Sequence, residues 1–221
     1  MPRKKVQIVN GEYYHVYNRG VDKREIFQDE KDYLKFLRNL KDFNNKSYYE
    51  QRIQELESKK ERGSFLFRKD KTVSIVAYSL LPNHYHLILK QLKDNGISNF
   101  MHKVGTSFTN FFNKKYNRSG RLFQGPYKTI HVNDNNYLLW LSGYVNGNVE
   151  IHRIEKTKNY KWSSFNSFIE KGRNEILNDK DIILSQFKNS RDYKIFVDEV
   201  IKDSRKRKET LKGEMEKYLL E

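Results

Sequence analysis

Apolar positions alternate or recur at helical spacing along most of the chain, and this pattern divides it into short elements. Runs rich in β-branched and aromatic residues predict strands over residues 12–18, 73–81, 85–92 and 127–132. Apolar residues spaced three and four apart predict helices over residues 29–43 and 97–113, and another from an N-cap at 133–134 to about residue 148. Pro82-Asn83 between the second and third strands is typical of a turn and predicts an antiparallel hairpin.

The order of these elements is strand, helix, strand, strand, helix, strand, helix. It predicts an α+β fold of the split βαβ, ferredoxin-like kind, in which helices pack against an antiparallel sheet. We expect residues 1–168 to form this domain, with a polar, exposed helical insertion at 46–63. Residues 169–221 are expected to be a C-terminal helical or partly disordered basic extension.

The formal net charge of +15, from 43 Lys and Arg against 28 Asp and Glu, points first to a polyanionic partner such as nucleic acid. The alternative is that the charge only keeps a basic protein in solution. The absence of cysteine excludes disulfides, thiolate metal sites and a thiol nucleophile. No long apolar run indicates a signal peptide or membrane span, so we expect a cytoplasmic protein.

Two histidines, His84 and His86, stand at the start of the third predicted strand. Residues two apart in a strand point to the same face, so the two imidazoles are expected side by side. Such a pair could share one divalent cation, although many pairs of this kind are only part of a polar face. An open site with two histidines needs a third ligand from another part of the chain.

The last predicted helix carries Tyr144 and, one turn later, Asn148. Periodicity does not select Tyr144, because the chain has 15 tyrosines and a tyrosine in an amphipathic helix usually belongs to the core or its rim. Gly143 and Gly147 directly precede these two residues. They allow the close approach of another backbone, DNA or the sheet, or else they mark a weak helix end.

Five segments in order along the chain carry a family resemblance: Tyr14–Gly20, Leu81–Leu87, Gly120–Lys128, Tyr144–Val149 and Tyr160–Phe165. Over about residues 12–168 they resemble the HUH single-tyrosine transposases, and most closely the REP-associated tyrosine transposases. His84-Tyr85-His86 is similar to the motif of that family in which a bulky apolar residue separates two histidines. The family usually has proline after the residue that corresponds to Asn148, where this chain has Val149.

The resemblance implies that Tyr144 is the nucleophile and that His84, His86 and Asn148 hold Mg²⁺ or Mn²⁺. It implies a transposase with single-strand endonuclease and strand-transfer activity, which works through a 5′-phosphotyrosine intermediate. The expected partner is single-stranded DNA beside a hairpin, either a repetitive extragenic palindrome or the end of a mobile element. The resemblance allows both a monomer and a homodimer.

Basic residues that would contact this DNA lie just before and within the third family segment, together with one in the first: Arg19, Lys114, Lys115, Arg118, Arg121 and Lys128. Positive charge follows phosphates while neighbouring rings can stack on unpaired bases. The alternative is a solvated loop with buried aromatics. A further basic run at 205–208 could add nonspecific phosphate affinity or be a solvated end.

Two other functions remain open from the residues alone. One is a nucleic-acid-binding module without catalysis on the same scaffold. The other is a metal-dependent nuclease that uses water, in which Tyr144 is only structural.

Overall fold

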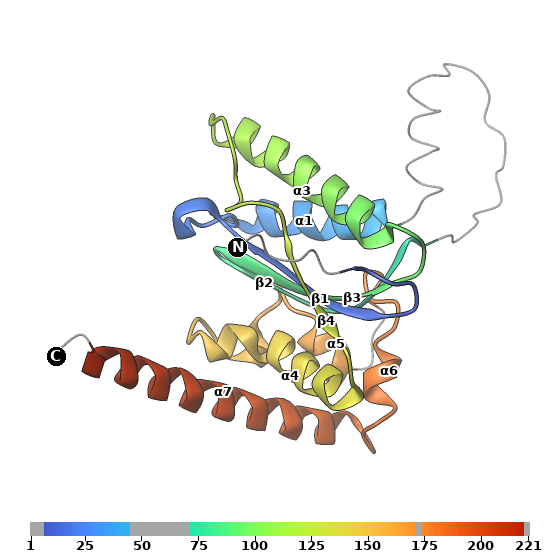
Figure 1. Cartoon of the computed structure of the whole chain (residues 1–221), viewed down its shortest axis with the longest axis vertical. Coiled ribbons are helices and arrows are strands. Elements are labelled where there is room, and N and C mark those ends of the chain that lie inside the picture. Colours follow the sequence, from blue (N-terminus) through green and yellow to red (C-terminus); the bar gives the residue numbers. More distant parts are fainter. Residues whose placement is uncertain (1–6, 45–70, 171–173, 219–221) are drawn as a thin grey trace.

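The computed structural model describes residues 7–44, 71–170 and 174–218, with side chains as far as residue 210. The insertion predicted at 46–63 lies outside the described residues. The molecule has three layers, with a sheet between helices α1 and α3 on one face and helices α4 and α7 on the other (Figure 1). Among the described residues, no helix is long and apolar enough to cross a membrane.

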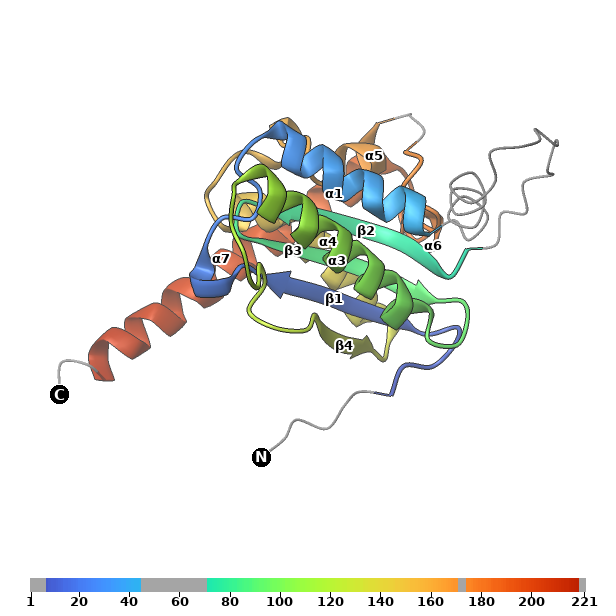
Figure 2. The ribbon, with the colours of Figure 1, turned by 90° about the horizontal axis from the view of Figure 1, so that it is seen from above.

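The sheet has four strands in the order β2-β3-β1-β4, and each is antiparallel to its neighbours. The strands are β1 (Tyr13–Arg19), β2 (Val73–Leu81), β3 (His84–Gln91) and β4 (Lys128–Val132). This order confirms the split βαβ prediction, because β1 and β2 are separated by β3 as the motif requires. The short strand β4 lies at one edge of the sheet (Figure 2).

Alternation along β3 sends its side chains to two different cores. Tyr85, Leu87 and Leu89 are buried in the cluster that α1 (Glu30–Phe43) and α3 (Gly96–Lys115) cover. Ile88 is buried in the cluster on the α4 side, and His84 and His86 share its parity. The histidine pair therefore faces α4 (Asn135–Ile151) rather than the two helices that follow β1 and β3 in sequence.

Helix α4 begins where the sequence predicts, because the Asp134 side chain accepts a hydrogen bond from the backbone N–H of Tyr137 at 2.7 Å. It continues past the predicted end to Ile151. Leu138, Leu141 and Val145 are buried against the sheet. These contacts hold α4 against the sheet and so fix the position of Tyr144 above the strands.

The C-terminal segment packs on the outside of α4. After the short helices η2 (Thr157–Asn159), α5 (Phe165–Ile169) and α6 (Asp181–Leu184), the long helix α7 (Ser190–Tyr218) runs beside α4 (Figure 1). Tyr193, Val197 and Ile201, spaced by one helical turn, are buried in the same core as α4. The described part of the C-terminal segment therefore contributes core residues to the face of the sheet that carries the histidines.

The two glycines of α4 are explained by α7, and not by DNA or the sheet as the sequence suggested. A Cβ atom at Gly147 would lie 2.6 Å from Cγ1 of Ile201, and one at Gly143 would lie 2.9 Å from Cγ2 of Val200. Such separations are closer than carbon atoms tolerate, so only glycine lets α7 approach α4 this closely.

The segment 160–165 covers the open edge of β2. The backbone N–H of Leu80 donates to the carbonyl of Trp162 at 3.0 Å, and that of Ser164 donates to the carbonyl of Tyr78 at 2.9 Å. An uncovered edge strand would present free backbone groups to other chains. This aromatic segment therefore has a structural role beside the histidine-bearing face.

Candidate active site

The two predicted histidines lie side by side below α4. The centroids of the His84 and His86 rings are 5.1 Å apart and the rings are nearly perpendicular, at 85°. His86 lies opposite Tyr17 of β1 and Ser79 of β2, whereas His84 lies at the end of the ladder opposite Arg19. The alternation predicted from the sequence therefore places both imidazoles on one face of the sheet.

Each of these histidines has its Nδ1 atom engaged within the protein. Nδ1 of His84 lies 2.6 Å from Oδ1 of Asn83. Because an amide oxygen only accepts, this Nδ1 carries the proton and Nε2 keeps a free lone pair. Nδ1 of His86 lies 2.8 Å from Nε2 of His15, and the tautomer that donates to His15 likewise leaves Nε2 free. Histidines that bind metals are oriented in this way by a partner on the second nitrogen.

Burial keeps the histidines of this face neutral. It lowers the pKa of His84 to about 3 and that of His15 to about 4. Burial also lowers the pKa of His152 to about 4, and that of His86 well below its usual value. Neutral imidazole is the form that binds a metal ion, so the pair is ready to act as ligands near pH 7.

Tyr144 reaches the histidines from α4. Its ring centroid is 5.8 Å from that of His86, at 88°, and its other side stacks on Trp140 at 5.3 Å. Burial raises the pKa of the Tyr144 phenol, and the nearby amide of Asn148 opposes this shift. Tyr17 of β1 lies at a similar distance from His86, 5.7 Å between centroids. Ring distance alone therefore does not distinguish these two tyrosines.

Asn148 distinguishes Tyr144 from Tyr17. The Asn148 side chain is fully buried one turn beyond Tyr144, where its amide raises the pKa of His84 and lowers that of Tyr144. Nevertheless neither its Oδ1 nor its Nδ2 makes a hydrogen bond of good geometry within the described part of the chain. A buried polar group that is left unsatisfied costs up to about 1–3 kcal/mol, so an amide with hydrogen bonds this poor contributes little to stability.

The donors around Asn148 fit a divalent cation. Within residues 7–44, 71–170 and 174–210, no three His, Cys, Asp or Glu side chains gather as a metal site, so a third ligand must be of another type. The amide oxygen of Asn148 is a hard donor that lies beside His84 and makes no hydrogen bond of good geometry with the described residues. The predicted set of His84, His86 and Asn148 is thus brought together by β3 and α4.

A third histidine and two basic side chains lie beside His84. The His152 ring lies 5.1 Å from that of His84, and Nζ of Lys208, from α7, lies 3.2 Å from Nε2 of His152. The charges of Arg19 and Lys208 both lower the pKa of His84. His152 follows Asn148 by one helical turn, which is a signal that the sequence contained. No pattern in the sequence places Lys208 beside His152, because this contact depends on how α7 packs on α4.

Residues 8–160 match the family model described as "Transposase IS200 like", which is more than half of the chain. The chain belongs to the IS200-like transposase family. A solved structure of a REP-associated tyrosine transposase bound to a REP hairpin has the same fold, with a TM-score of 0.56 and 13% sequence identity. The superposition covers 81% of this chain and 93% of that chain. No curated protein matches the chain by sequence.

In this IS200-like transposase, two of the basic residues predicted to contact DNA lie near the histidines. Arg19 is one, and its buried Nε has no hydrogen-bond partner among the described residues. Lys128 is the other, with Nζ 5.8 Å from the centroid of the Tyr17 ring. Arg19 lies on β1, which pairs with the histidine-bearing strand β3. Lys128 lies on β4, which pairs with β1.

The other four predicted contacts lie at the end of α3 and in the loop after it. Lys115 is held by Asp29 and Asp32, each 2.6 Å from its Nζ, which ties α3 to the start of α1. Arg118 donates to Oδ1 of Asn113 at 2.7 Å and to the carbonyl of Arg121 at 3.2 Å. Lys114 and Arg121 are exposed. Lys115 and Arg118 thus have internal partners, and the loop that they organise returns along the end of β1.

Proposed function

We propose that this protein cleaves and rejoins single-stranded DNA through a covalent bond between Tyr144 and a 5′ phosphate. The observation that carries the proposal is the buried amide of Asn148, which lies beside both Tyr144 and His84 and makes no hydrogen bond of good geometry with the described residues. A buried amide whose hydrogen bonds are this poor adds little to stability. A ligand at this point explains its presence, and membership of a transposase family supports the same conclusion.

In the cleavage step the phenolic oxygen of Tyr144 attacks the scissile phosphorus. A new O–P bond to tyrosine forms as the bond from phosphorus to the 3′ oxygen breaks. The phenol loses its proton and the departing 3′ oxygen gains one by way of solvent. Since one phosphoester replaces another, a second 3′ hydroxyl can reverse the step and join new ends without a high-energy cofactor.

His84, His86 and Asn148 are the side chains that would hold the divalent cation, Mg²⁺ or Mn²⁺. When bound, the cation polarises the scissile phosphate and stabilises the negative charge that develops on it. The two Nε2 lone pairs are oriented for this purpose by Asn83 and His15. The protein thus supplies ligands whose tautomers and directions are set before the cation arrives.

The cationic side chains around the histidines would bind the remaining phosphate oxygens. The charges of Arg19 and Lys208 both lower the pKa of His84, so both would attract a phosphate bound beside this histidine. Because burial raises the pKa of Tyr144, loss of its proton needs compensating positive charge. Arg19 and Lys208, whose charges act on His84 in the same site, would supply a part of that charge.

The proposed substrate is a DNA strand that carries a hairpin next to the cleavage site. The solved neighbour is a REP-associated tyrosine transposase bound to a REP hairpin, which supports a substrate of this class. Its phosphates would contact the basic loop that contains Arg118 and Arg121, together with the side chains of Arg19 and Lys208.

The test is to incubate the protein with labelled hairpin-bearing single strands and Mn²⁺ or Mg²⁺, and to separate the products on a denaturing gel. We expect a covalent adduct that Tyr144→Phe abolishes, whereas Tyr137→Phe, seven residues earlier on α4, retains it. Cleavage by Tyr144→Phe would contradict the tyrosine mechanism. Cleavage without an adduct would support a water-using nuclease, and binding without cleavage would support a binding module.

A further inference from the structure

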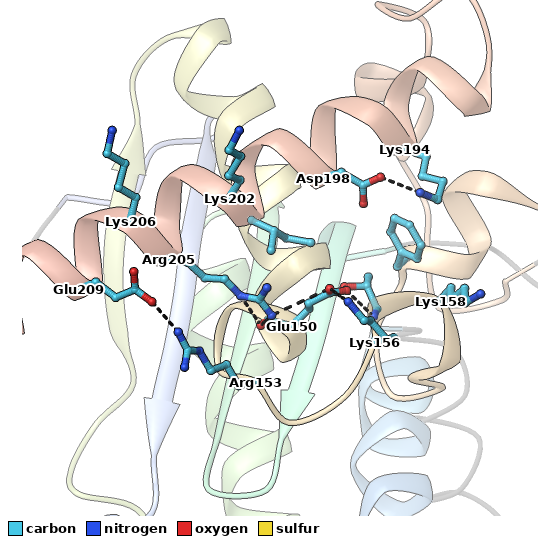
Figure 3. A pocket seen from close by; sticks show the side chains of 13 residues that line it. Glu150, Arg153, Lys156, Lys158, Lys194, Asp198, Lys202, Arg205, Lys206 and Glu209 are labelled. Atoms are coloured by element: carbon cyan, nitrogen blue, oxygen red, sulfur yellow. Dashed lines mark hydrogen bonds and ion pairs between the residues drawn. The ribbon is translucent and has the colours of Figure 1, made fainter.

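A basic groove lies between α7 and the segment that leads from the end of α4 to η2. Its volume is about 780 Å³, and its lining contains seven Lys or Arg residues against three Asp or Glu residues. Figure 3 shows Arg205 and Glu209 reaching from α7 toward Glu150 and Arg153, whereas Lys202 and Lys206, which also line the groove, project from the other side of the helix. The groove is thus strongly positive and is formed by parts of the chain about 50 residues apart, as the Arg205–Glu150 contact illustrates.

The acidic residues of the groove are already paired. Lys194 lies 2.6 Å from Asp198, and Lys156 lies 2.8 Å from Glu150. Glu209 pairs with Arg153. The excess positive charge therefore belongs to Arg205 and to the other lysines of the lining.

Three of these lysines have no acidic partner among the described residues: Lys158, Lys202 and Lys206. Lys202 and Lys206 are one turn apart on α7, and Lys158 lies on the opposite side in η2. Like charges one turn apart on a helix, as at Lys202 and Lys206, repel each other and weaken the fold. A bound solute with several negative charges in succession removes that repulsion.

The groove adjoins the candidate active site. Arg153 lines the groove and follows His152, whose ring is 5.1 Å from that of His84. On α7, Arg205 lines the groove, and Lys208, one turn later, contacts His152. A strand that passes the histidines can therefore continue directly into the groove.

We propose that this groove binds the sugar-phosphate backbone of the DNA strand that flanks the cleavage site. The proposal deepens the proposed function and rests on it, because the strand is taken to be the one that Tyr144 cleaves. The apolar residues of the lining, Phe165 and Ile201, are buried and expose almost no surface on which a base could stack. Contact is therefore with phosphates, and binding in the groove does not depend on base sequence.

The test compares a short hairpin substrate with versions extended by unpaired nucleotides on the 5′ or the 3′ side. Affinity is measured by fluorescence anisotropy over a range of salt concentrations. The groove variant replaces Lys158, Lys202 and Lys206 with glutamine. The control variant removes the same charge from exposed residues elsewhere, with Lys31→Gln, Arg38→Gln and Lys188→Gln.

We expect one of the two extensions to bind the unaltered protein about tenfold more tightly than the short substrate, and the groove variant to lose this gain. The slope of log affinity against log salt should fall by about 2 for that extension, since each phosphate contact to a single strand contributes about 0.7. Extensions of scrambled sequence should behave alike. The control variant should keep the gain.

Equal losses in the groove and control variants, or a gain that survives in the groove variant, would overturn the proposal. The adduct assay on the short substrate separates this result from the proposed function. If the short substrate forms the Tyr144 adduct while extensions bind equally in all variants, the groove proposal fails and the function stands. If extensions need the groove lysines but no adduct forms, the groove stands and the function fails.

Discussion

Nδ1 of His86 lies 2.8 Å from Nε2 of His15, which joins the histidine pair of β3 to a third histidine on the neighbouring strand β1. The two rings are also stacked, with centroids 5.0 Å apart and an interplanar angle of 20°. His15 therefore holds the orientation of His86, and the tautomer in which His86 donates to His15 leaves its Nε2 free. It lies behind the candidate ligand, where it acts as a positioning residue.

The first prediction concerns metal affinity. His15→Ala should lower the affinity for Mn²⁺ by about 10–100-fold, because His86 loses the partner that orients it. Isothermal titration of the DNA-free protein with Mn²⁺ measures this effect directly. His102→Ala, at an exposed position on α3, is the matched control and should bind Mn²⁺ as the unaltered protein does. An unchanged affinity in His15→Ala would show that His86 is not a ligand held by His15.

A second prediction concerns stability and pH. The pKa of His15 is about 4 in the folded protein and 6.5 in the unfolded chain. Between these values the unfolded chain binds a proton that the folded one does not, so the free energy of unfolding falls as the pH falls from about 7 to about 4. The His15 contribution is at most about 3 kcal/mol, and it is fully present above pH 7. His84 and His152 act in the same direction.

Denaturant titrations at pH 7.5 and pH 5 in the absence of metal measure this effect. His15→Gln should make the free energy of unfolding less dependent on pH than in the unaltered protein, whereas His102→Gln should leave the dependence as it is. A steeper dependence in His15→Gln would contradict the burial of a neutral imidazole at this position.

A third prediction concerns the contact between α4 and α7. Gly147→Ala should destabilise the protein by about 1–2 kcal/mol, because overpacking against Ile201 outweighs the gain in helix propensity. Gly105→Ala on α3 is the control, since a Cβ there meets nothing within 4 Å. It should stabilise the protein by up to about 1 kcal/mol. Denaturant midpoints measure both changes, and stabilisation by Gly147→Ala would mean that α7 does not pack where the structure places it.

A fourth prediction separates the cost of Asn148 from its use. Asn148→Leu should leave the metal-free protein equally stable or more stable by about 1 kcal/mol, because it removes a buried amide without a partner. The same variant should lose metal-dependent cleavage. Thermal unfolding without metal and the cleavage assay give the two results. Strong destabilisation with cleavage retained would show that the amide serves the fold and not the reaction.

Local patterns were sufficient to predict the strands and most helices of the core. Alternation placed His84 and His86 on one face, and the Asp134 cap set the start of α4. Tyr144 and Asn148 were brought together by the helical repeat that they share. These features depend on residues close in sequence, and so the sequence carries them directly.

The remaining parts of the site depend on contacts between distant segments. His15 meets His86 because β1 inserts between β3 and β4, and the register of that pairing has no short-range signal. Tyr193, Val197 and Ile201 do recur every four residues, but the charged residues among them obscure a helix that packs on α4. Without that packing, Lys208 and the basic groove cannot be placed from the sequence.

The central claim is that Tyr144 forms the bond to DNA. After incubation with a hairpin-bearing strand and Mn²⁺, the protein is digested and the nucleotide-bearing peptide is identified by mass spectrometry. The structure offers a second tyrosine, Tyr17, at nearly the same distance from His86, so the measurement discriminates between two positions among 15 tyrosines. We predict that the modification lies on Tyr144, next to Asn148. A modification on Tyr17, or cleavage with no modified peptide, would contradict the account.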